Sequence, residues 1–342
     1  MTSSKDTSQE EHAPRNHRRQ LFIIIGIVVV VILGILAIPY YQNYIAPFNR
    51  TVITVDGQKI TMRYFIDRAV LAGADPMSML QTLTEEKVIE IAAPQYGVVV
   101  TDEDIEKELR SAAAGDAETI SDIEFKEWYR QKLNDSHTND KMYKQLVRSS
   151  LLASRMQSYL ADLTPSTAEQ IHLHTIVVGT YEDAQKVEDR LKAGEDFAAV
   201  AKEASLDTSS KDNGGDVGWL PPVLLANFQS VITSLEINEV SDPLAYYDTS
   251  SASSSSSGSS TPSAYYIFKV SEKDSNRELS EQNLQYLKNE ALTLWLPDEI
   301  NRHSIQYNFN SEIYAWINWQ IEKQSTSNTS GSSSTNSSTS GN

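Results

Sequence analysis

The sequence has no cysteine and only six histidines among its 342 residues. Without cysteine the chain cannot form disulfide frameworks, thiolate nucleophiles, thiolate zinc sites or iron–sulfur clusters. The HExxH, GxxxxGK[ST] and GxSxG motifs are missing as well. Zincins, P-loop NTPases and serine hydrolases are therefore poor interpretations, and the sequence predicts no cofactor and no resident metal.

Basic residues are also scarce, because 29 Lys and Arg stand against 46 Asp and Glu and give a net charge of −17 at pH 7. A surface of this sign repels the phosphate backbones of nucleic acids, so nucleic acid is not an expected partner. At about 150 residues per domain, the length of the chain predicts two folded units.

One long apolar run lies near the N-terminus, at residues 21–38, LFIIIGIVVVVILGILAI. A helix of this run is about 27 Å long, close to the hydrocarbon thickness of a bilayer. Three arginines precede the run. This flank predicts a cytoplasmic tail over 1–20, a single transmembrane helix over 21–40 and translocation of everything that follows. A cleaved signal peptide is the competing interpretation of the same run.

Two stretches of low complexity divide the remaining chain. Residues 324–342 and 248–264 consist almost entirely of Ser, Thr, Asn and Gly. Such segments bury too little apolar surface to offset their ordering entropy, so we expect a disordered tail and a Ser-rich loop insertion.

Residues 48–163 carry mostly helical patterns. A short hairpin is expected around Asp56-Gly57, within residues 51–60. Three helix starts follow from capping residues: Asp75 before Pro76, Thr101 with Asp104, and Ser121 with Glu124. This region is therefore predicted to be an all-α domain.

From residue 165 to residue 275 the pattern changes. Residues 170–178 alternate as a strand, 181–193 and 196–205 read as helices, and 265–270 read as a closing strand. A strand, helices and a second strand in this order predict a small α+β domain.

Four motifs in this second region carry a resemblance to a known family. They are HTIVV from His174, the GxxF motif of Gly194 to Phe197, NGGDVGW at 213–219, and YYIFKV at 265–270. The motifs resemble those of the parvulin-type (rotamase) peptidyl-prolyl isomerases. The resemblance implies a parvulin domain over 165–275, with a small antiparallel sheet surrounded by helices and the Ser-rich insertion 248–264.

The VDGQKIT and YGVVVTDEDIEKEL segments of the first region resemble the N-terminal region of PrsA/SurA-type foldases, which implies a chaperone region over 48–163.

The parvulin resemblance also implies site residues, which are His174, Asp207, Tyr266 and Ser263 for catalysis, and Leu225, Phe228 and Trp219 for substrate binding. His174 matches the first of the family's two paired histidines, and Asp207 matches its cysteine-or-aspartate position. Tyr266 stands where the second histidine belongs, which implies reduced isomerase activity. We expect its phenol to hydrogen-bond to His174 across neighbouring strands.

His172 and His174 share one face of the predicted strand. A pair of histidines with this spacing can bind a metal ion, but the spacing reveals no third ligand. A metal site is therefore the weaker interpretation of the two histidines.

The last helical pattern, at 280–296, has an apolar stripe that a single helix cannot bury. The helices of 48–163 also have unpartnered stripes, so we expect 276–323, with Trp316 and Trp319, to pack on that region.

Taken together, the patterns and the resemblance predict a foldase anchored in the cell membrane, with one N-terminal transmembrane helix. It is expected to isomerise X-Pro bonds in unfolded or partly folded exported polypeptides and to act as their chaperone outside the cytoplasm. One alternative is a holdase whose parvulin domain is weakly active or inactive, which Tyr266 favours. Another is a structural surface protein with a Ser-rich stalk. The oligomeric state is left open, a homodimer included.

Overall fold

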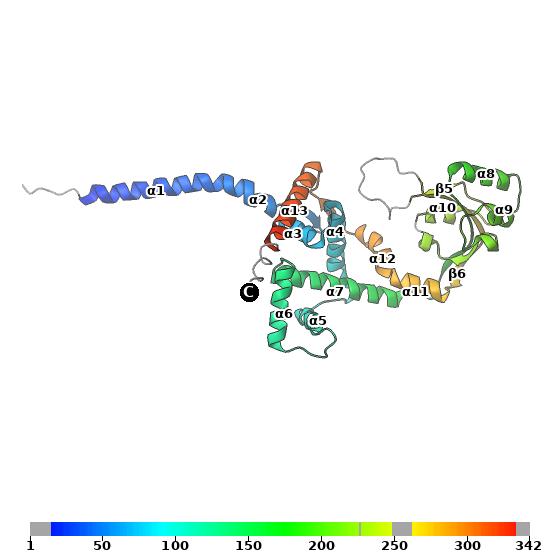
Figure 1. The fold of residues 1–342 in the computed structure, drawn as a ribbon, viewed down its shortest axis with the longest axis horizontal. Helices are drawn as coiled ribbons and strands as arrows, with labels where there is room; N and C mark the ends of the chain where they lie inside the picture. Colours follow the sequence, from blue (N-terminus) through cyan, green and yellow to red (C-terminus); the bar gives the residue numbers. More distant parts are fainter. Residues whose placement is uncertain (1–14, 226, 248–261, 333–342) are drawn as a thin grey trace, which may run out of the picture. The chain divides into compact units, whose positions relative to one another are not determined.

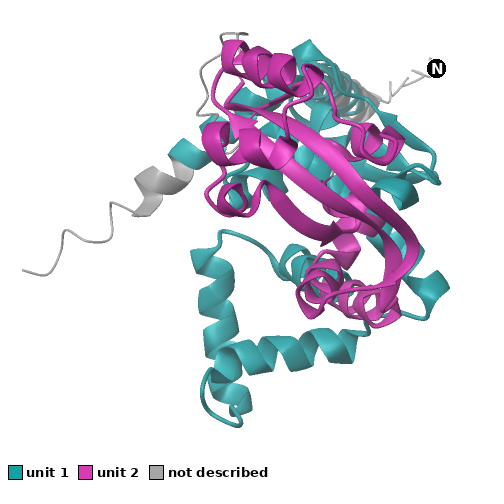
Figure 2. Cartoon of the chain, turned by 90° about the vertical axis from the view of Figure 1, so that its right-hand side faces the viewer, with its two compact units in different colours: residues 1–153, 296–342 teal, residues 154–295 magenta. Residues whose placement is uncertain are grey.

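The chain leaves its first folded unit at residue 153 and returns to it at residue 296 (Figure 2). Unit 1 comprises residues 1–153 and 296–342, and unit 2 comprises residues 154–295. The computed structural model describes residues 15–225, 227–247 and 262–332 (Figure 1). Most of the Ser-rich insertion 248–264, most of the tail 1–20 and the end of the tail 324–342 lie outside the described residues.

The elements of the chain before the parvulin-like motifs are mostly helical, with one hairpin. They are α1 (Arg15–Tyr40), η1 (Tyr41–Ile45), α2 (Ala46–Asn49), β1 (Thr51–Val55), β2 (Gln58–Thr61), α3 (Met62–Ala72), α4 (Pro76–Ala92), η2 (Ala93–Tyr96), α5 (Asp102–Ala114), α6 (Asp122–Asp135) and α7 (Asp140–Leu163).

The following elements alternate between strands and short helices, and then end in helices. They are β3 (Thr167–Val178), α8 (Tyr181–Lys192), α9 (Phe197–Ala204), η3 (Lys211–Asn213), β4 (Asp216–Leu220), η4 (Pro222–Leu225), α10 (Gln229–Ser234), β5 (Leu244–Tyr246), β6 (Ala264–Glu278), α11 (Glu281–Asn289), α12 (Ala291–Ile300), β7 (Ile305–Tyr307) and α13 (Ser311–Ser332).

The apolar run near the N-terminus forms helix α1, which η1 and α2 continue. Within the described residues, one helical segment, Ile25–Asn49, is long and apolar enough to cross a membrane, with a mean hydropathy of 2.2. This is a statement about length and composition, and a signal sequence near the N-terminus meets the same criterion.

The expected hairpin is present. Strands β1 and β2 pair through a turn in which Asp56 has φ +47° and Gly57 has φ +80°. Two consecutive residues with positive φ are typical of the tight turns that match the twist of a hairpin.

A third strand joins this hairpin from the far end of the chain. Strand β7 pairs with the other edge of β1, with Ile53 opposite Tyr307 and Val55 opposite Ile305. The sequence predicts the hairpin but an otherwise all-α domain, whereas unit 1 contains this three-stranded sheet in the order β2-β1-β7. Strand β7 has three residues, which is too short to show a strand pattern of its own, and it forms because β1 has an edge to pair with.

The core of unit 1 unites the hairpin with the C-terminal helix. Val52, Phe65 and Ile317 are fully buried in the same cluster. The Trp316 ring packs against Phe48, with 5.3 Å between ring centroids. Residues 296–323 therefore lie in unit 1 with the N-terminal helices, whereas residues 276–295 lie in unit 2.

Within unit 2, the start of α12 is held by the C-terminal part of α7. The Gln157 side-chain amide donates hydrogen bonds to the carbonyl oxygens of Lys288 and Asn289 at 2.5 and 3.0 Å, and its oxygen accepts one from Leu292 N at 2.8 Å. One side chain thus satisfies the backbone groups at the junction of α11 and α12, as helix ends require.

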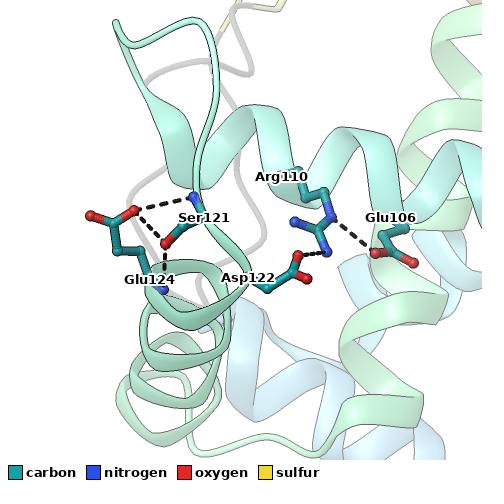
Figure 3. A network of polar contacts seen from close by, with 5 residues as sticks. All are labelled: Glu106, Arg110, Ser121, Asp122 and Glu124. Atoms are coloured by element: carbon teal, nitrogen blue, oxygen red, sulfur yellow. Dashed lines mark hydrogen bonds and ion pairs between the residues drawn. The ribbon is translucent and has the colours of Figure 1, made fainter.

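The capping residues start the helices that the sequence predicts. The Asp75 carboxylate accepts hydrogen bonds from Met77 N and Ser78 N. Thr101 with Asp104, and Ser121 with Glu124, form reciprocal capping boxes, and Figure 3 shows the second of them.

Helices α5 and α6 are also joined by an arginine. Arg110 bridges Glu106 on its own helix and Asp122 at the start of α6, with both N–O distances at 2.9 Å (Figure 3). The same guanidinium lies over the Phe125 ring, 4.5 Å from its centroid. The two carboxylates are exposed and Arg110 is half-buried, so this network orients the two helices and adds little stability.

The tail from residue 324 differs from its predicted disorder. Helix α13 continues through residues 324–332 and ends at Ser332. Adding a residue to an existing helix costs much less free energy than nucleating a helix. A helix whose first turns are packed in the core through Ile317 can therefore extend into a polar sequence.

We expect Ile317→Ala to lower the free energy of unfolding of unit 1 by about 3 kcal/mol, because it leaves a cavity in a closed core. Trp319→Ala is the matched control on the same helix, since the Trp319 side chain is 52 % exposed. The measurement is chemical unfolding of the full chain followed by circular dichroism. Equal effects of the two substitutions would contradict the packing of α13 in this core.

Candidate active site

The sheet of unit 2 has the order β4-β3-β6-β5, and its paired strands are antiparallel. Strand β3 lies in the interior of the sheet, where it pairs with β4 along one side and with β6 along the other. Ile176 and Val178 of β3 pack with residues of α8 and α9, whereas Ile171 and Leu173 pack with Ile232 of α10. The two faces of the sheet therefore have separate cores, as the two-residue period of a strand requires.

A cavity of about 630 Å³ opens on the α10 side of the sheet. Its walls are mostly apolar and aromatic, and they come from β3, β4, β5, β6, η4, the segment between η4 and α10, and the loop after α9. The lining residues are Leu173, Thr175, Val177, Leu206, Asp207, Val217, Leu224, Leu225, Asn227, Phe228, Tyr246, Tyr266 and Phe268. A cavity of this size, with few polar groups, is typical of small binding sites.

Aromatic side chains form one wall of this cavity. Phe228 lies 5.3 Å from Tyr266 and 5.2 Å from Phe268, measured between ring centroids, and Tyr246 lies 5.6 Å from Tyr266. Burial, together with the charges of Tyr246 and Asp207, raises the pKa of the Tyr266 phenol. Tyr266 is therefore protonated at neutral pH and can donate a hydrogen bond.

Asp207 is the acidic group in the wall. Its carboxylate accepts hydrogen bonds from the Ser209 hydroxyl at 2.6 Å, from Ser209 N at 3.0 Å and from the Ser210 hydroxyl at 2.5 Å. The bonds from Ser209 and Ser210 lower the pKa of this carboxyl from its ordinary value. Asp207 is therefore a fixed negative charge at neutral pH, held by its own turn.

The loop that carries Asp207 is attached to β3 by backbone contacts. Leu206 N donates to Val177 O at 2.7 Å, and Thr175 N donates to Gly215 O at 2.8 Å. Gly215 has φ +78°, and a Cβ there would lie 2.5 Å from Thr175 O. Glycine at this position allows the two backbones to approach closely, which places Asp207 beside the strand.

Thr175 contributes a second polar group to the cavity. The residue is 5 % exposed, and its buried Oγ1 has no hydrogen-bond partner in the part of the chain that the structure describes. Buried hydroxyls usually have partners, so an unpaired one in a cavity wall is available to a ligand.

A family model described as "Rotamase: PPIC-type PPIASE domain" matches residues 178–272. These residues form a PPIC-type parvulin domain. The predicted parvulin resemblance is confirmed, and so is the fold class of antiparallel sheet and helices.

Curated relatives of the chain are foldase proteins PrsA. The protein from Caldanaerobacter subterraneus subsp. tengcongensis is 29 % identical over 168 residues, which are 49 % of this chain and 52 % of that one. The protein from Geobacillus kaustophilus is 27 % identical over 215 residues, which are 60 % and 65 %. The matches thus span about half to two thirds of these relatives. A solved structure of PrsA from Bacillus cereus is 18 % identical and has a TM-score of 0.34, over 81 % of this chain and 92 % of that one.

The parvulin domain brings together four of the seven residues that the sequence assigns to the site. Asp207, Tyr266, Leu225 and Phe228 all line the cavity. Asp207 comes from the loop after α9, Tyr266 from β6, Leu225 from η4, and Phe228 from the segment that connects η4 to α10.

His174 is not brought to this cavity. On β3 and β6, His174 is paired with Lys269, and Val177 is paired with Tyr266. The side chains of successive pairs point to opposite faces of the sheet, so these two pairs, which are three residues apart on β3, lie on opposite faces. Thr175 faces the cavity, so its neighbour His174 faces the other side of the sheet. The expected hydrogen bond between Tyr266 and His174 is absent among the described residues, and His174 lies instead 3.3 Å from the Ser271 hydroxyl.

Trp219 and Ser263 also lie outside the cavity wall. The Trp219 ring stacks on His172 with 5.3 Å between centroids, and Arg277 lies 4.1 Å above it. Ser263 is exposed, and its backbone N–H donates to Tyr246 O at 2.7 Å.

The sequence reasoning missed several residues of the wall, among them Thr175, Leu206, Tyr246 and Phe268. Strand alternation gives the signal for Thr175, because Leu173, Thr175 and Val177 follow one another with period two. No such alternating pattern marks Tyr246 or Leu206, because Tyr246 lies on the three-residue edge strand β5 and Leu206 lies in a loop.

We expect Gly215→Ala to lower the free energy of unfolding of the parvulin domain by about 2 kcal/mol or more, because it combines a positive φ with a backbone clash. Gly194→Ala is the control, since Gly194 has φ +89° but no atom within 4 Å of its added Cβ. Its cost should be about 1 kcal/mol, from the φ angle alone. Urea unfolding of the full chain measures both, and an equal cost would argue against the close approach.

Proposed function

We propose that the parvulin domain isomerises X-Pro peptide bonds in unfolded or partly folded exported polypeptides. Rotation about this bond crosses a barrier of about 18–20 kcal/mol, because resonance gives the C–N bond partial double-bond character. Uncatalysed X-Pro isomerisation takes tens of seconds or more, which is slow enough to limit folding. The function requires no covalent intermediate, since an enzyme need only bind the twisted amide better than the planar one.

The observation that carries this proposal is the pairing of an apolar cavity with a fixed carboxylate in its wall. Leu225, Phe228 and Phe268 offer the apolar surface that a proline ring needs. The negative charge of Asp207 opposes the shift of electron density onto the carbonyl oxygen. It therefore favours the localised, single-bonded amide of the transition state.

Two further side chains have roles in this proposal. The Thr175 hydroxyl has no hydrogen-bond partner among the described residues and can hydrogen-bond to the substrate backbone. The Tyr266 phenol is protonated and occupies the place of the family's second histidine, so it supplies a donor without supplying a base. We propose that this replacement makes the isomerase slower than one with paired histidines.

We expect Asp207→Asn and Thr175→Val each to lower kcat/KM for an X-Pro peptide by about tenfold, a loss of about 1.4 kcal/mol of transition-state binding. Asn keeps one acceptor oxygen for Ser209, and its amide N–H can donate to the Ser210 hydroxyl. Val keeps the shape of Thr, so both variants should fold. Asp212→Asn is the matched control, because Asp212 is exposed on η3 and outside the cavity.

The measurement is the relaxation of a cis X-Pro peptide in the presence of the full chain. If Asp207→Asn and Thr175→Val match the unaltered chain, the assignment of the cavity is wrong. A chain that has no isomerase activity but suppresses aggregation of an unfolded client would support the holdase function instead.

The chaperone part of the proposal assigns client binding to unit 1. A second cavity of about 520 Å³ in that unit is lined by apolar residues such as Ile60 and Leu83, and by charged residues such as Arg63 and Glu86. Mixed walls of this kind suit weak binding of varied polypeptide segments.

We further propose that α1 anchors the chain in the cell membrane, with residues 41–342 outside the cytoplasm. The apolar segment follows arginines and precedes Tyr40 and Tyr41, which suit the membrane–water interface. We expect protease added to spheroplasts to digest both units, and the mature protein to keep its N-terminal helix by mass spectrometry. Full protection of both units would contradict the topology, and a mature chain that begins after the helix would show a cleaved leader.

A further inference from the structure

Two histidines and an aspartate meet on the sheet face opposite the cavity. His172 and His174 come from β3 and Asp216 comes from β4, and one donor atom of each lies within 4.8 Å of the other two. The His172 and His174 rings are 5.3 Å apart between centroids, and His172 Nε2 is 2.9 Å from Asp216 Oδ1. All three residues are half-buried.

A bulge in β4 creates this juxtaposition. Leu173 is opposite Gly218 and His174 is opposite Asp216, so Val217 is an extra residue. Gly218 has φ +83°, as the bulge requires. Val217 consequently lines the cavity on one face of the sheet, while Asp216 joins the histidines on the other.

A hydrogen bond to Ser271 makes Nδ1 of His174 the ring nitrogen that can bind a ligand. The Ser271 hydroxyl donates to His172 O at 3.2 Å, so it accepts from His174 Nε2, which is 3.3 Å away. A proton on Nε2 leaves the lone pair of Nδ1 unprotonated.

The surroundings of His172 favour ligation through Nε2. Its Nδ1 is buried, has no hydrogen-bond partner within residues 15–225, 227–247 and 262–332, and lies 3.6 Å from Glu272 Oε1. With Nε2 on a metal, Nδ1 carries the proton and Glu272 is positioned to accept it. Metal-bound histidines usually have such a carboxylate behind them.

A backbone N–H of β4 also holds the Asp216 oxygen that contacts His172. Gly218 N donates to Asp216 Oδ1 at 2.8 Å. The 2.9 Å contact between this carboxylate oxygen and His172 Nε2 is close to the spacing of about 3.3 Å between two tetrahedral zinc ligands. A metal ion can thus replace the proton that the two atoms share in its absence.

We propose that His172, His174 and Asp216 bind a divalent transition-metal ion, with Glu272 and Ser271 as outer partners of the two imidazoles. Two nitrogen donors and one carboxylate suit Zn²⁺, Ni²⁺ or Cu²⁺, whereas Mg²⁺ and Ca²⁺ prefer oxygen ligands alone. Three protein ligands leave one position for water. The ion would link β3, β4 and β6 and stabilise the parvulin domain.

The test uses the full chain in detergent, freed of metal by chelation, and titrated with Zn²⁺ at pH 7.5 against a competing chromophoric chelator. We expect one Zn²⁺ per chain and a dissociation constant at least tenfold larger in Asp216→Asn and in His174→Gln. Asn keeps an acceptor for Gly218 N, so the bulge should survive. His137→Asn is the control and should bind unchanged, because His137 is exposed and its φ of +50° suits Asn.

Absorption spectroscopy at the zinc edge on the unaltered chain gives a readout that does not depend on how the variants fold. Two imidazole nitrogens and a carboxylate oxygen around the ion would support the site. Coordination by oxygen alone, equal affinity in all variants, or no binding below millimolar Zn²⁺ would each overturn it. Those results would leave His172 and Asp216 as a hydrogen-bonded pair that holds the bulge.

Discussion

The alternation of side chains along strand β3 is the constraint on which the rest of the parvulin domain depends. This strand has paired neighbours on both edges, so a shift of one residue would move every side chain to the wrong face. Leu173, Thr175 and Val177 consequently line the cavity, and His174 faces away from it. The same period that builds the candidate isomerase site therefore also builds the candidate metal site behind it.

The loop with Asp207 depends in turn on a close contact of backbones. Gly215 lies against Thr175 O at a distance that admits no side chain, and Leu206 N donates to Val177 O. The loop that carries Asp207 is thus attached to β3 at two points. Hydrogen bonds from Ser209 and Ser210 keep the Asp207 carboxyl ionised. A reaction that only twists an amide needs such fixed charges and apolar surface, and it makes no demand for the thiolates that the chain lacks.

Unit 1 shows that a long insertion is compatible with a well-closed core. Strands β1 and β7 pair with each other although all of unit 2 lies between them in the sequence. Ile317 is fully buried in one cluster with Val52 and Phe65. The entropy of closing a loop grows only with the logarithm of its length, and an inserted folded unit can keep the two ends near each other. The core of unit 1 therefore depends on residues from both ends of the chain.

The sequence by itself determined the features that rest on short spacings: the turn at Asp56-Gly57, the capping residues Asp75, Thr101 and Ser121, the apolar run of α1, and the parvulin motifs with Asp207. Local backbone geometry and hydrophobic pattern are sufficient for these. Tertiary structure decided which face His174 occupies, where Trp219 and Ser263 lie, that three residues at Ile305–Tyr307 form a strand, and that Asp216 joins two histidines. Each of these depends on strand register, on a bulge or on the edge of a distant strand, and such pairings between remote residues leave no periodic signal along the chain.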